Sequence, residues 1–406
     1  MKVLVVNTYN MKGGAARAAL RLYEALCCVG ADVRYLTVYQ DNPDWKRKIR
    51  YFLRVLKDRL PAILRSRRKI YFSSGGFNNP TFIEAVNASE ADIVHLHWIN
   101  AGALSYSDIS RINKPIVWSL HDMWLFTGGC HYDGNCEAFK KGCGSCPQLG
   151  SKGKNDLSKR NYEAKHKMVM GITNLTVVGL SRWIATSAKS SAMMKEIKVV
   201  NLPNPIDTSV FFPESKIASR AKFGLRDSKQ VILFGAMSGA DDPRKGYSQL
   251  IHALKSLNDI DNFQLATFGG DMNGLPSLGI EVKSLGKVSD DATLRALYSA
   301  ADVVVVPSLQ ENLSNIIMES LACGTPVVGF NIGGNSDLIQ HKLNGYLADA
   351  NNAKSLAEGI EWVLSGGEAR NLSDNARNFA VSNFNYETVG AKYLKLYEDI
   401  LKNQIQ

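Results

Sequence analysis

Short runs of apolar residues alternate with longer stretches of helical periodicity, and this pattern occurs twice along the chain. The first set of runs covers residues 3–6, 33–38, 92–96 and 115–120, and the second set covers 231–234, 263–268, 302–306 and 325–330. Short buried strands separated by helices are typical of parallel sheets with helices on both faces. The pattern therefore predicts the α/β class, with two doubly wound domains.

A proline-rich segment, NLPNPIDTSVFFP at residues 201–213, predicts the connection between the two domains. We expect an N-terminal domain over 1–200, a C-terminal domain over 201–385, and a last helix over 386–406 that packs back on the first domain. The apolar positions of that helix are Val389, Tyr393, Leu396, Tyr397 and Ile400. Open parallel sheets bind ligands at the carboxyl ends of their strands. Two facing domains therefore predict an active site in the cleft between them.

The length and composition fit this organisation. A chain of 406 residues exceeds one ordinary hydrophobic core, and 45% hydrophobic residues are typical of a globular protein. No apolar run has the length needed to cross a bilayer, and the start MKVLVV is read as a first strand and not as a signal peptide. We therefore expect a cytoplasmic protein whose seven cysteines stay reduced.

The segment from Pro307 to Gly334 carries the strongest chemical signal. Glu311 and Glu319 stand eight positions apart, and Asn312, Leu313 and Ser314 follow the first of them directly. A carboxylate at a strand end, free N–H groups at a helix start and a second carboxylate two turns later form a polar cup. Such a cup suits a sugar, a diphosphate and a ribose together.

This segment, with LACGTPVV after Glu319, resembles the retaining glycosyltransferases of the GT-B fold, in their large fourth sequence family (group 1), of the bacterial polysaccharide-biosynthesis type. Further pieces occur in the family's order: GGAARAA, WSLHD, LPNPID and RKG. The resemblance implies two facing Rossmann-like domains and transfer of a sugar from a nucleotide-sugar donor to a glycan or lipid-linked acceptor in cell-surface polysaccharide synthesis. Two alternatives stay open: another GT-B enzyme, such as an epimerase or phosphorylase, and a non-catalytic sugar-nucleotide binding protein.

The resemblance also implies roles for residues of the C-terminal domain. Glu311 would contact donor-sugar hydroxyls and Glu319 the ribose, while Lys245 would hold the diphosphate and stabilise the leaving group. The family's usual Arg is replaced by Ala236, so Arg244 is the candidate stand-in. Base contacts are expected from the backbone near Val288.

The N-terminal domain is expected to supply the remaining contacts. Gly13 and Gly14 follow the first strand, where glycine allows close backbone approach and the next helix presents its N-terminus to phosphate. The resemblance gives His121 a catalytic role, in which it contacts the donor sugar or helps to orient the acceptor, with His97 and Asp122 on the acceptor side. No covalent nucleophile stands out, and we expect no catalytic metal ion, because cationic side chains and helix dipoles would neutralise the phosphates.

A cysteine-rich loop at residues 127–150 lies outside the common pattern. Cys130, Cys136, Cys143 and Cys146 fall within 17 positions, and the last two have the C-x-x-C spacing of zinc sites. A structural zinc site is predicted, with His131 as an alternative ligand. Two disulfides, or cysteines without any cross-link, stay open as alternatives. In each case we expect the loop to shape the acceptor side.

A basic segment at residues 45–70 accounts for the net charge. Between Lys46 and Lys69 there are eleven Lys or Arg and one acidic residue, Asp58, while the whole chain carries +10. This concentration favours one local basic surface over a nucleic-acid-binding protein. The apolar positions have helical spacing: Ile49, Phe52, Leu53, Leu56, Leu60, Ile63 and Leu64. Such a helix, which Pro61 is expected to break or kink, suits an anionic membrane at its inner face, or else packs on its own domain.

Overall fold

The computed structural model describes residues 1–66, 71–236, 242–270, 279–288, 290–366 and 371–405. The chain divides into two compact units, Met1–Asn204 with Val389–Gln406, and Pro205–Thr388. The division between Asn204 and Pro205 falls within the proline-rich segment. Three predicted features lie partly outside the described residues: the end of the basic segment (67–70), the loop after Ala236 (237–241) and residue 289 beside Val288.

The first unit contains a six-stranded sheet in the order β2-β1-β3-β4-β5-β6, and its strand pairs are parallel. The strands are β1 Lys2–Asn7, β2 Asp32–Thr37, β3 Ile93–Leu96, β4 Ile116–Leu120, β5 Leu175–Gly179 and β6 Lys198–Asn201. Every residue of β3, β4 and β5 is buried, as expected for central strands covered on both faces.

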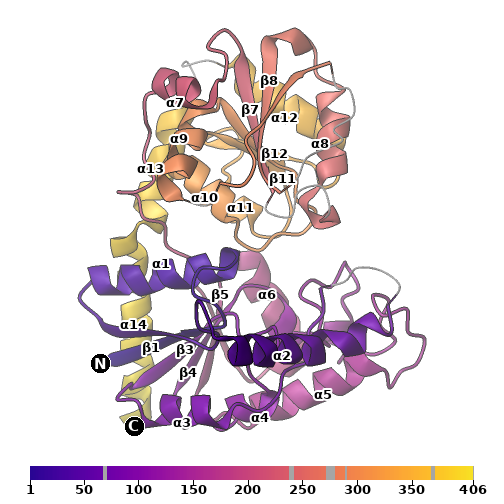
Figure 1. Ribbon diagram of the computed structural model, residues 1–406, viewed down its shortest axis with the longest axis vertical. Coiled ribbons are helices and arrows are strands. Elements are labelled where there is room, and N and C mark those ends of the chain that lie inside the picture. Colours follow the sequence, from indigo (N-terminus) through magenta and orange to yellow (C-terminus); the bar gives the residue numbers. More distant parts are fainter. Residues whose placement is uncertain (67–70, 237–241, 271–278, 289, 367–370, 406) are drawn as a thin grey trace. The chain divides into compact units, whose positions relative to one another are not determined.

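The helices of the first unit surround this sheet (Figure 1). They are α1 Gly14–Cys28, α2 Trp45–Ile63, α3 Pro80–Ala88, α4 Tyr106–Ile109, α5 Leu157–Met170, α6 Arg182–Ser190 and α14 Tyr386–Ile405. Of the break or kink expected at Pro61, the break is wrong, because α2 continues to Ile63, and the kink stays a prediction. Pro61 lies in the last turn, where its ring disturbs only the end of the helix.

The last helix, α14, belongs to the first unit although it follows the second in sequence. In Figure 1 it runs in yellow beside the strands of that unit. Val389, Tyr393 and Tyr397 are fully buried, and the Tyr397 hydroxyl lies 2.7 Å from Nδ1 of His95 on β3. The predicted apolar stripe of this helix therefore faces the core of the first unit.

The second unit repeats the architecture, with a parallel sheet in the order β12-β11-β10-β7-β8-β9. Its strands are β7 Gln230–Ala236, β8 Phe263–Gly269, β9 Glu281–Ser284, β10 Val303–Val306, β11 Val327–Phe330 and β12 Gly345–Ala348. Its helices are α7 Lys216–Phe223, α8 Tyr247–Leu254, α9 Asp291–Ala300, α10 Asn315–Ala322, α11 Asn335–Leu338, α12 Ala353–Ser365 and α13 Leu372–Phe384. The predicted α/β class with two doubly wound parallel sheets is confirmed.

The described helices include none that is both long and apolar enough to cross a membrane.

Candidate functional site

Several predicted donor-binding residues follow strands of the second sheet at one edge. Lys245 comes after β7, Val288 after β9, and Glu311 to Ser314 after β10. Because these strands are parallel, their carboxyl ends meet at the same edge of the sheet. Val288 is half-buried there, in the loop that leaves β9.

An ion pair joins Lys245 and Glu311 at this edge. Nζ of Lys245 donates a hydrogen bond to Oε2 of Glu311 at 2.6 Å, and the two side chains are 33% and 13% exposed. The turn that presents Lys245 is built on Gly246, which has φ +66°. A Cβ there would lie 1.7 Å from the Pro307 carbonyl oxygen, so only glycine brings this turn against the end of β10.

Arg244, the candidate stand-in for the missing family Arg, pairs with Asp242 instead. Its Nε and Nη2 donate to the two carboxylate oxygens at 3.1 and 2.8 Å. Burial acts to raise the pKa of Asp242, but the hydrogen bonds and charge of Arg244 outweigh it and hold this pKa below its usual value. Asp242 therefore stays ionised and orients Arg244.

Helix α10 begins at Asn315, four residues after Glu311, with Ser314 as its N-cap. Asn312, Leu313 and Ser314 are buried, and the Ser314 side chain makes no capping hydrogen bond to the helix. Helix N-termini attract anions through their N–H groups and dipole. Glu319, on the same helix, is only 2% exposed and accepts a hydrogen bond from the Tyr298 hydroxyl at 2.8 Å. Its expected contact with a ribose stays a prediction.

In the first unit, Gly13 and Gly14 lie at the start of α1. Gly13 has φ +94°, where an L side chain is strained, and it precedes the helix without a side-chain cap. No atom lies within 4 Å of the place where its Cβ would be, so the glycine serves the backbone conformation and not close packing.

His97 and His121 meet at the carboxyl ends of β3 and β4. Nδ1 of His97 lies 2.9 Å from Nε2 of His121, so one ring donates to the other. Burial lowers the pKa of His121 to about 4 and that of His97 well below its usual value, so both are neutral at pH 7. His97 Nε2 and Asn100 Oδ1 are buried without a hydrogen-bond partner in this structure, and both residues line a small pocket with His121 and Asp122. Unsatisfied buried polar atoms beside a pocket are typical of a binding site.

Sequence reasoning did not foresee that Asp122 joins the cysteine-rich loop to this pocket. Oδ2 of Asp122 accepts from His131 Nδ1 at 2.6 Å and from Trp98 Nε1 at 3.0 Å. Burial acts to raise the pKa of Asp122, but His131 and these hydrogen bonds lower it overall. The sequence signal was weak, because Asp122 and His131 are single polar residues nine positions apart and spacing alone does not pair them.

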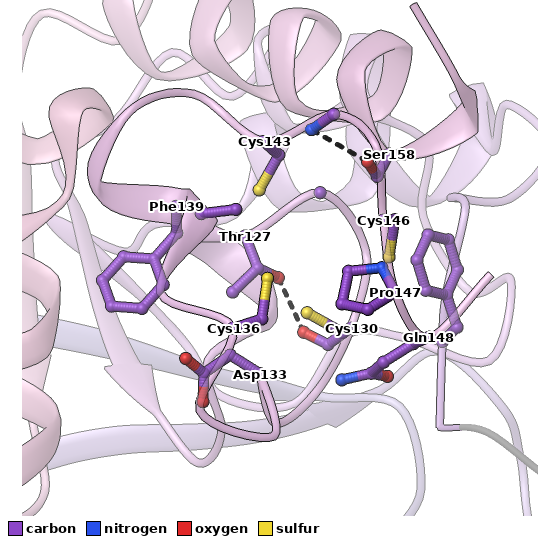
Figure 2. A pocket seen from close by; sticks show the side chains of 14 residues that line it. Thr127, Cys130, Asp133, Cys136, Phe139, Cys143, Cys146, Pro147, Gln148 and Ser158 are labelled. Carbon is purple, nitrogen blue, oxygen red and sulfur yellow. Dashed lines mark hydrogen bonds between the residues drawn. The ribbon is translucent and has the colours of Figure 1, made fainter. Parts of the chain in front are cut away.

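The four clustered cysteines line a second pocket in the first unit (Figure 2). Cys130 and Cys146 are buried, Cys136 and Cys143 are half-buried, and all four are free thiols. Burial raises the pKa of Cys143 to about 12 and also raises that of Cys130. Within the described ranges, no three His, Cys, Asp or Glu side chains form a group that could hold a metal ion as they stand.

His131, the alternative zinc ligand, lies apart from the four cysteines. His131 does not line the cysteine pocket, and both its ring nitrogens are engaged, with Asp122 and with the Ser73 hydroxyl at 3.0 Å. The suggestion of His131 as a replacement ligand stays a prediction, and it would require His131 to leave these two partners. The tetracysteine zinc site itself stays a prediction.

A buried lysine lies beside the cysteine pocket. Lys165 is fully buried, donates a hydrogen bond to the Trp124 carbonyl oxygen, and places Nζ 4.4 Å from the centre of the Trp124 ring. Burial lowers its pKa to about 7, while Cys130 and Cys143 act in the opposite direction. Among the described side chains no carboxylate lies within ion-pair distance of this amine.

Comparison with known proteins agrees with the sequence and the fold. Residues 215–379 match the model of the family "Glycosyl transferases group 1". The chain is 33% identical over 194 residues to an uncharacterized glycosyltransferase of Methanocaldococcus jannaschii, covering 46% of this chain and 49% of that protein. It is 28% identical over 208 residues to the phosphatidyl-myo-inositol mannosyltransferase of Mycobacterium leprae, covering 50% and 54%. These matches span about half the length of each relative.

The fold is shared over the whole chain with a solved structure. HepE of Anabaena, in complex with UDP-glucose, superposes with a TM-score of 0.65, covering 98% of this chain and all of that one at 17% identity. The match to the family model lies within the second unit, and the fold match covers both units. The second unit thus contains a region that matches the glycosyl transferases group 1, and the whole chain has the α/β fold of the GT-B type.

Proposed function

We propose that this enzyme moves a sugar from a nucleotide-sugar donor to a glycan or lipid-linked saccharide, with retention of the anomeric configuration, in cell-surface polysaccharide synthesis. The observation that carries the proposal is the Lys245–Glu311 pair beside the start of α10. A cation and a row of helix N–H groups suit a diphosphate, while a carboxylate suits sugar hydroxyls. The solved structure of HepE is a complex with UDP-glucose, which supports the donor class.

Donor binding would exchange the partners within this pair. The diphosphate would draw Lys245 away from Glu311, and the released carboxylate would accept hydrogen bonds from sugar hydroxyls. As the bond from the anomeric carbon to the diphosphate oxygen breaks, charge grows on that oxygen. Lys245 and the α10 dipole would stabilise this charge, which is the form of electrostatic catalysis that contributes most in many enzymes.

Retention is proposed through front-face attack. The acceptor oxygen bonds to the anomeric carbon on the face that the diphosphate leaves, and the acceptor proton passes to the departing diphosphate oxygen. His121 is neutral at pH 7, so it would orient the donor sugar by a hydrogen bond and not by charge. His97 and Asp122 would position the acceptor beside it. The name of the Mycobacterium leprae relative, a phosphatidyl-myo-inositol mannosyltransferase, supports a lipid-linked acceptor.

Slow hydrolysis of the donor without acceptor tests this proposal. We expect Lys245→Ala and Glu311→Ala each to reduce hydrolysis by roughly 100-fold or more, since each removes a group used in the transition state. The sugar first released should have the donor's anomeric configuration by proton NMR. Activity should persist in excess EDTA, because no catalytic metal ion is proposed.

Glu281→Ala provides the matched control. Glu281 is paired with Arg226 at 2.9 Å in the same unit, but it begins β9 and so lies away from the carboxyl ends. Its variant should hydrolyse the donor at the wild-type rate. Unchanged turnover in both Lys245→Ala and Glu311→Ala would show that the assigned site is wrong.

A further inference from the structure

Helix α2 has an inverted arrangement of polar and apolar side chains. Its buried residues are Arg54, Asp58 and Ala62, one stripe at four-residue intervals. Its large apolar side chains are exposed on the opposite face: Trp45 (67%), Ile49 (50%), Phe52 (66%), Leu53 (51%), Leu56 (38%), Leu60 (39%) and Ile63 (60%). An exposed apolar stripe of this extent typically marks a surface that binds a protein or a membrane.

Polar contacts on the inner face fix this orientation. The Arg54 guanidinium donates to the carbonyl oxygens of Phe77 at 3.0 Å and Ala103 at 3.2 Å. Asp58 accepts from the Gly75 N–H at 2.9 Å. Turning α2 to bury its apolar stripe would break these bonds and expose neighbouring backbone groups of the unit. The helix therefore keeps its apolar face outward.

Cations flank the apolar stripe on both sides. At 3.6 residues per turn, Lys46, Arg50 and Lys57 fall along one border, and Lys48 and Arg59 fall along the other. All five are exposed, and the single acidic residue of the helix, Asp58, is on the buried face. Long cationic side chains can keep their stems on an apolar surface while their charges reach outward.

We propose that the outer face of α2 docks on an anionic lipid bilayer, with its apolar stripe among the acyl chains and its flanking cations at the headgroups. The charge distribution selects this occupant. A row of cations on both borders, with no exposed acid between them, matches a uniformly negative surface, whereas a protein partner would have to supply carboxylates along two separate lines. Trp45, at the start of the helix, suits the interface between headgroups and chains.

This docking goes beyond the proposed sugar transfer, and it can be tested independently of that proposal. If the acceptor is lipid-linked, α2 would bring the first unit to the surface that holds it. The docking face contains none of the residues proposed to bind the donor. Donor hydrolysis in solution should therefore be unchanged in α2 variants, so failure of the one proposal is distinguishable from failure of the other.

Vesicle flotation tests the docking. The intact protein is mixed with vesicles of phosphatidylcholine, or of phosphatidylcholine with about one third phosphatidylglycerol, a content that gives a negative surface. We expect binding to the anionic vesicles, weakening as salt rises. We expect two triple variants each to bind the anionic vesicles with an affinity at least roughly tenfold lower. One is Phe52→Ser, Leu56→Ser, Ile63→Ser, and the other is Arg50→Gln, Lys57→Gln, Arg59→Gln.

The chain offers matched controls for both variants. Ile217 and Leu343 are exposed apolar residues of the second unit (69% and 55%), and Lys189, Lys195 and Lys198 are exposed cations of the first unit outside α2. Serine at the former pair and glutamine at the latter three should leave flotation unchanged. Melting temperatures and circular dichroism separate loss of docking from loss of fold.

Three outcomes would overturn the proposal. In the first, the wild type does not float with anionic vesicles. In the second, the α2 variants remain folded and float as well as the wild type. In the third, the wild type does not bind vesicles but forms a concentration-dependent dimer in light scattering, and the triple variant Phe52→Ser, Leu56→Ser, Ile63→Ser abolishes that dimer. That result would assign the apolar stripe to a second copy of the chain.

Discussion

Three buried histidines of the first unit, His95, His97 and His121, show how burial sets the charge of a single residue. Burial lowers the pKa of His95 to about 3 and of His121 to about 4. His95 is held between the Tyr397 hydroxyl and the Ser119 hydroxyl at 2.7 and 2.8 Å, so its neutral ring is fully hydrogen-bonded. The sequence identified His97 and His121 from their places after strands. It gave no sign of the hydroxyl partners, which come from distant positions.

These histidines predict that the protein loses stability in mild acid. Between the ordinary histidine pKa near 6.5 and about 4, the unfolded chain binds protons that the folded chain excludes. The free energy of unfolding should therefore fall as pH drops from about 7 to about 5.5, by up to about 1.4 kcal/mol per pH unit for each proton. Urea unfolding at both pH values measures this.

A variant separates the histidines from other acid-sensitive groups. His95→Gln should reduce the pH slope, even though it also lowers stability at pH 7 by removing the Tyr397 contact. His252→Gln, at an exposed position on α8, should leave the slope unchanged. Equal slopes in the wild type and His95→Gln would contradict the assignment.

At the scale of elements, the sequence predicted the central strands better than the edges. β6 and β9 were missed because each is short and partly exposed, as in KVVN and EVKS, and pairs only through one neighbour. β12, the other edge strand of the second sheet, and β5, which is buried, were also missed, whereas the edge strand β2 was predicted. The outward apolar face of α2 could not be predicted either, since periodicity shows that a helix is amphipathic but not which face meets the core.

The cysteine-rich loop at residues 127–150 contains little regular structure. Many of its residues adopt left-handed conformations, including Asn135, Glu137, Cys143 and Ser145, and its one described helical turn is Ala138–Lys140. A long loop with so little regular structure is typically held by a cross-link or a metal ion. Four thiolates around zinc carry a net charge of about −2, which would pair with the buried Lys165 amine.

We predict one zinc ion per chain in protein purified without chelator, measured by atomic absorption. Cys146→Ser should lose the metal and lower the melting temperature, because ligand loss frees the loop. Cys323→Ser, a buried cysteine of the second unit, should keep the zinc. A metal-free wild type with two oxidised cysteine pairs by mass spectrometry would favour disulfides, and a metal-free wild type with four reduced thiols would favour no cross-link.

At the scale of the whole molecule, the family resemblance of the sequence suggested the reaction class, and one rule of parallel sheets explains why Lys245 and Glu311 lie together. Lys245 and Glu311 are 66 positions apart, yet both follow strands whose carboxyl ends share an edge. The Arg244–Asp242 pair was not predicted. The sequence does not show the direction in which a side chain points from a turn, and here Arg244 turns to the nearby Asp242 carboxylate. The expected cleft between the two domains stays a prediction.

The central claim is that the carboxyl edge of the second sheet binds a nucleotide sugar through Lys245, and calorimetric titration tests it most directly. Uridine- and guanosine-linked sugars are titrated into wild type, Lys245→Ala and the control Glu281→Ala. We predict that at least one donor binds, that Lys245→Ala weakens it by about tenfold or more, and that Glu281→Ala leaves it unchanged. Equal affinity in Lys245→Ala and wild type, or no binding of any donor by the wild type, would contradict the account.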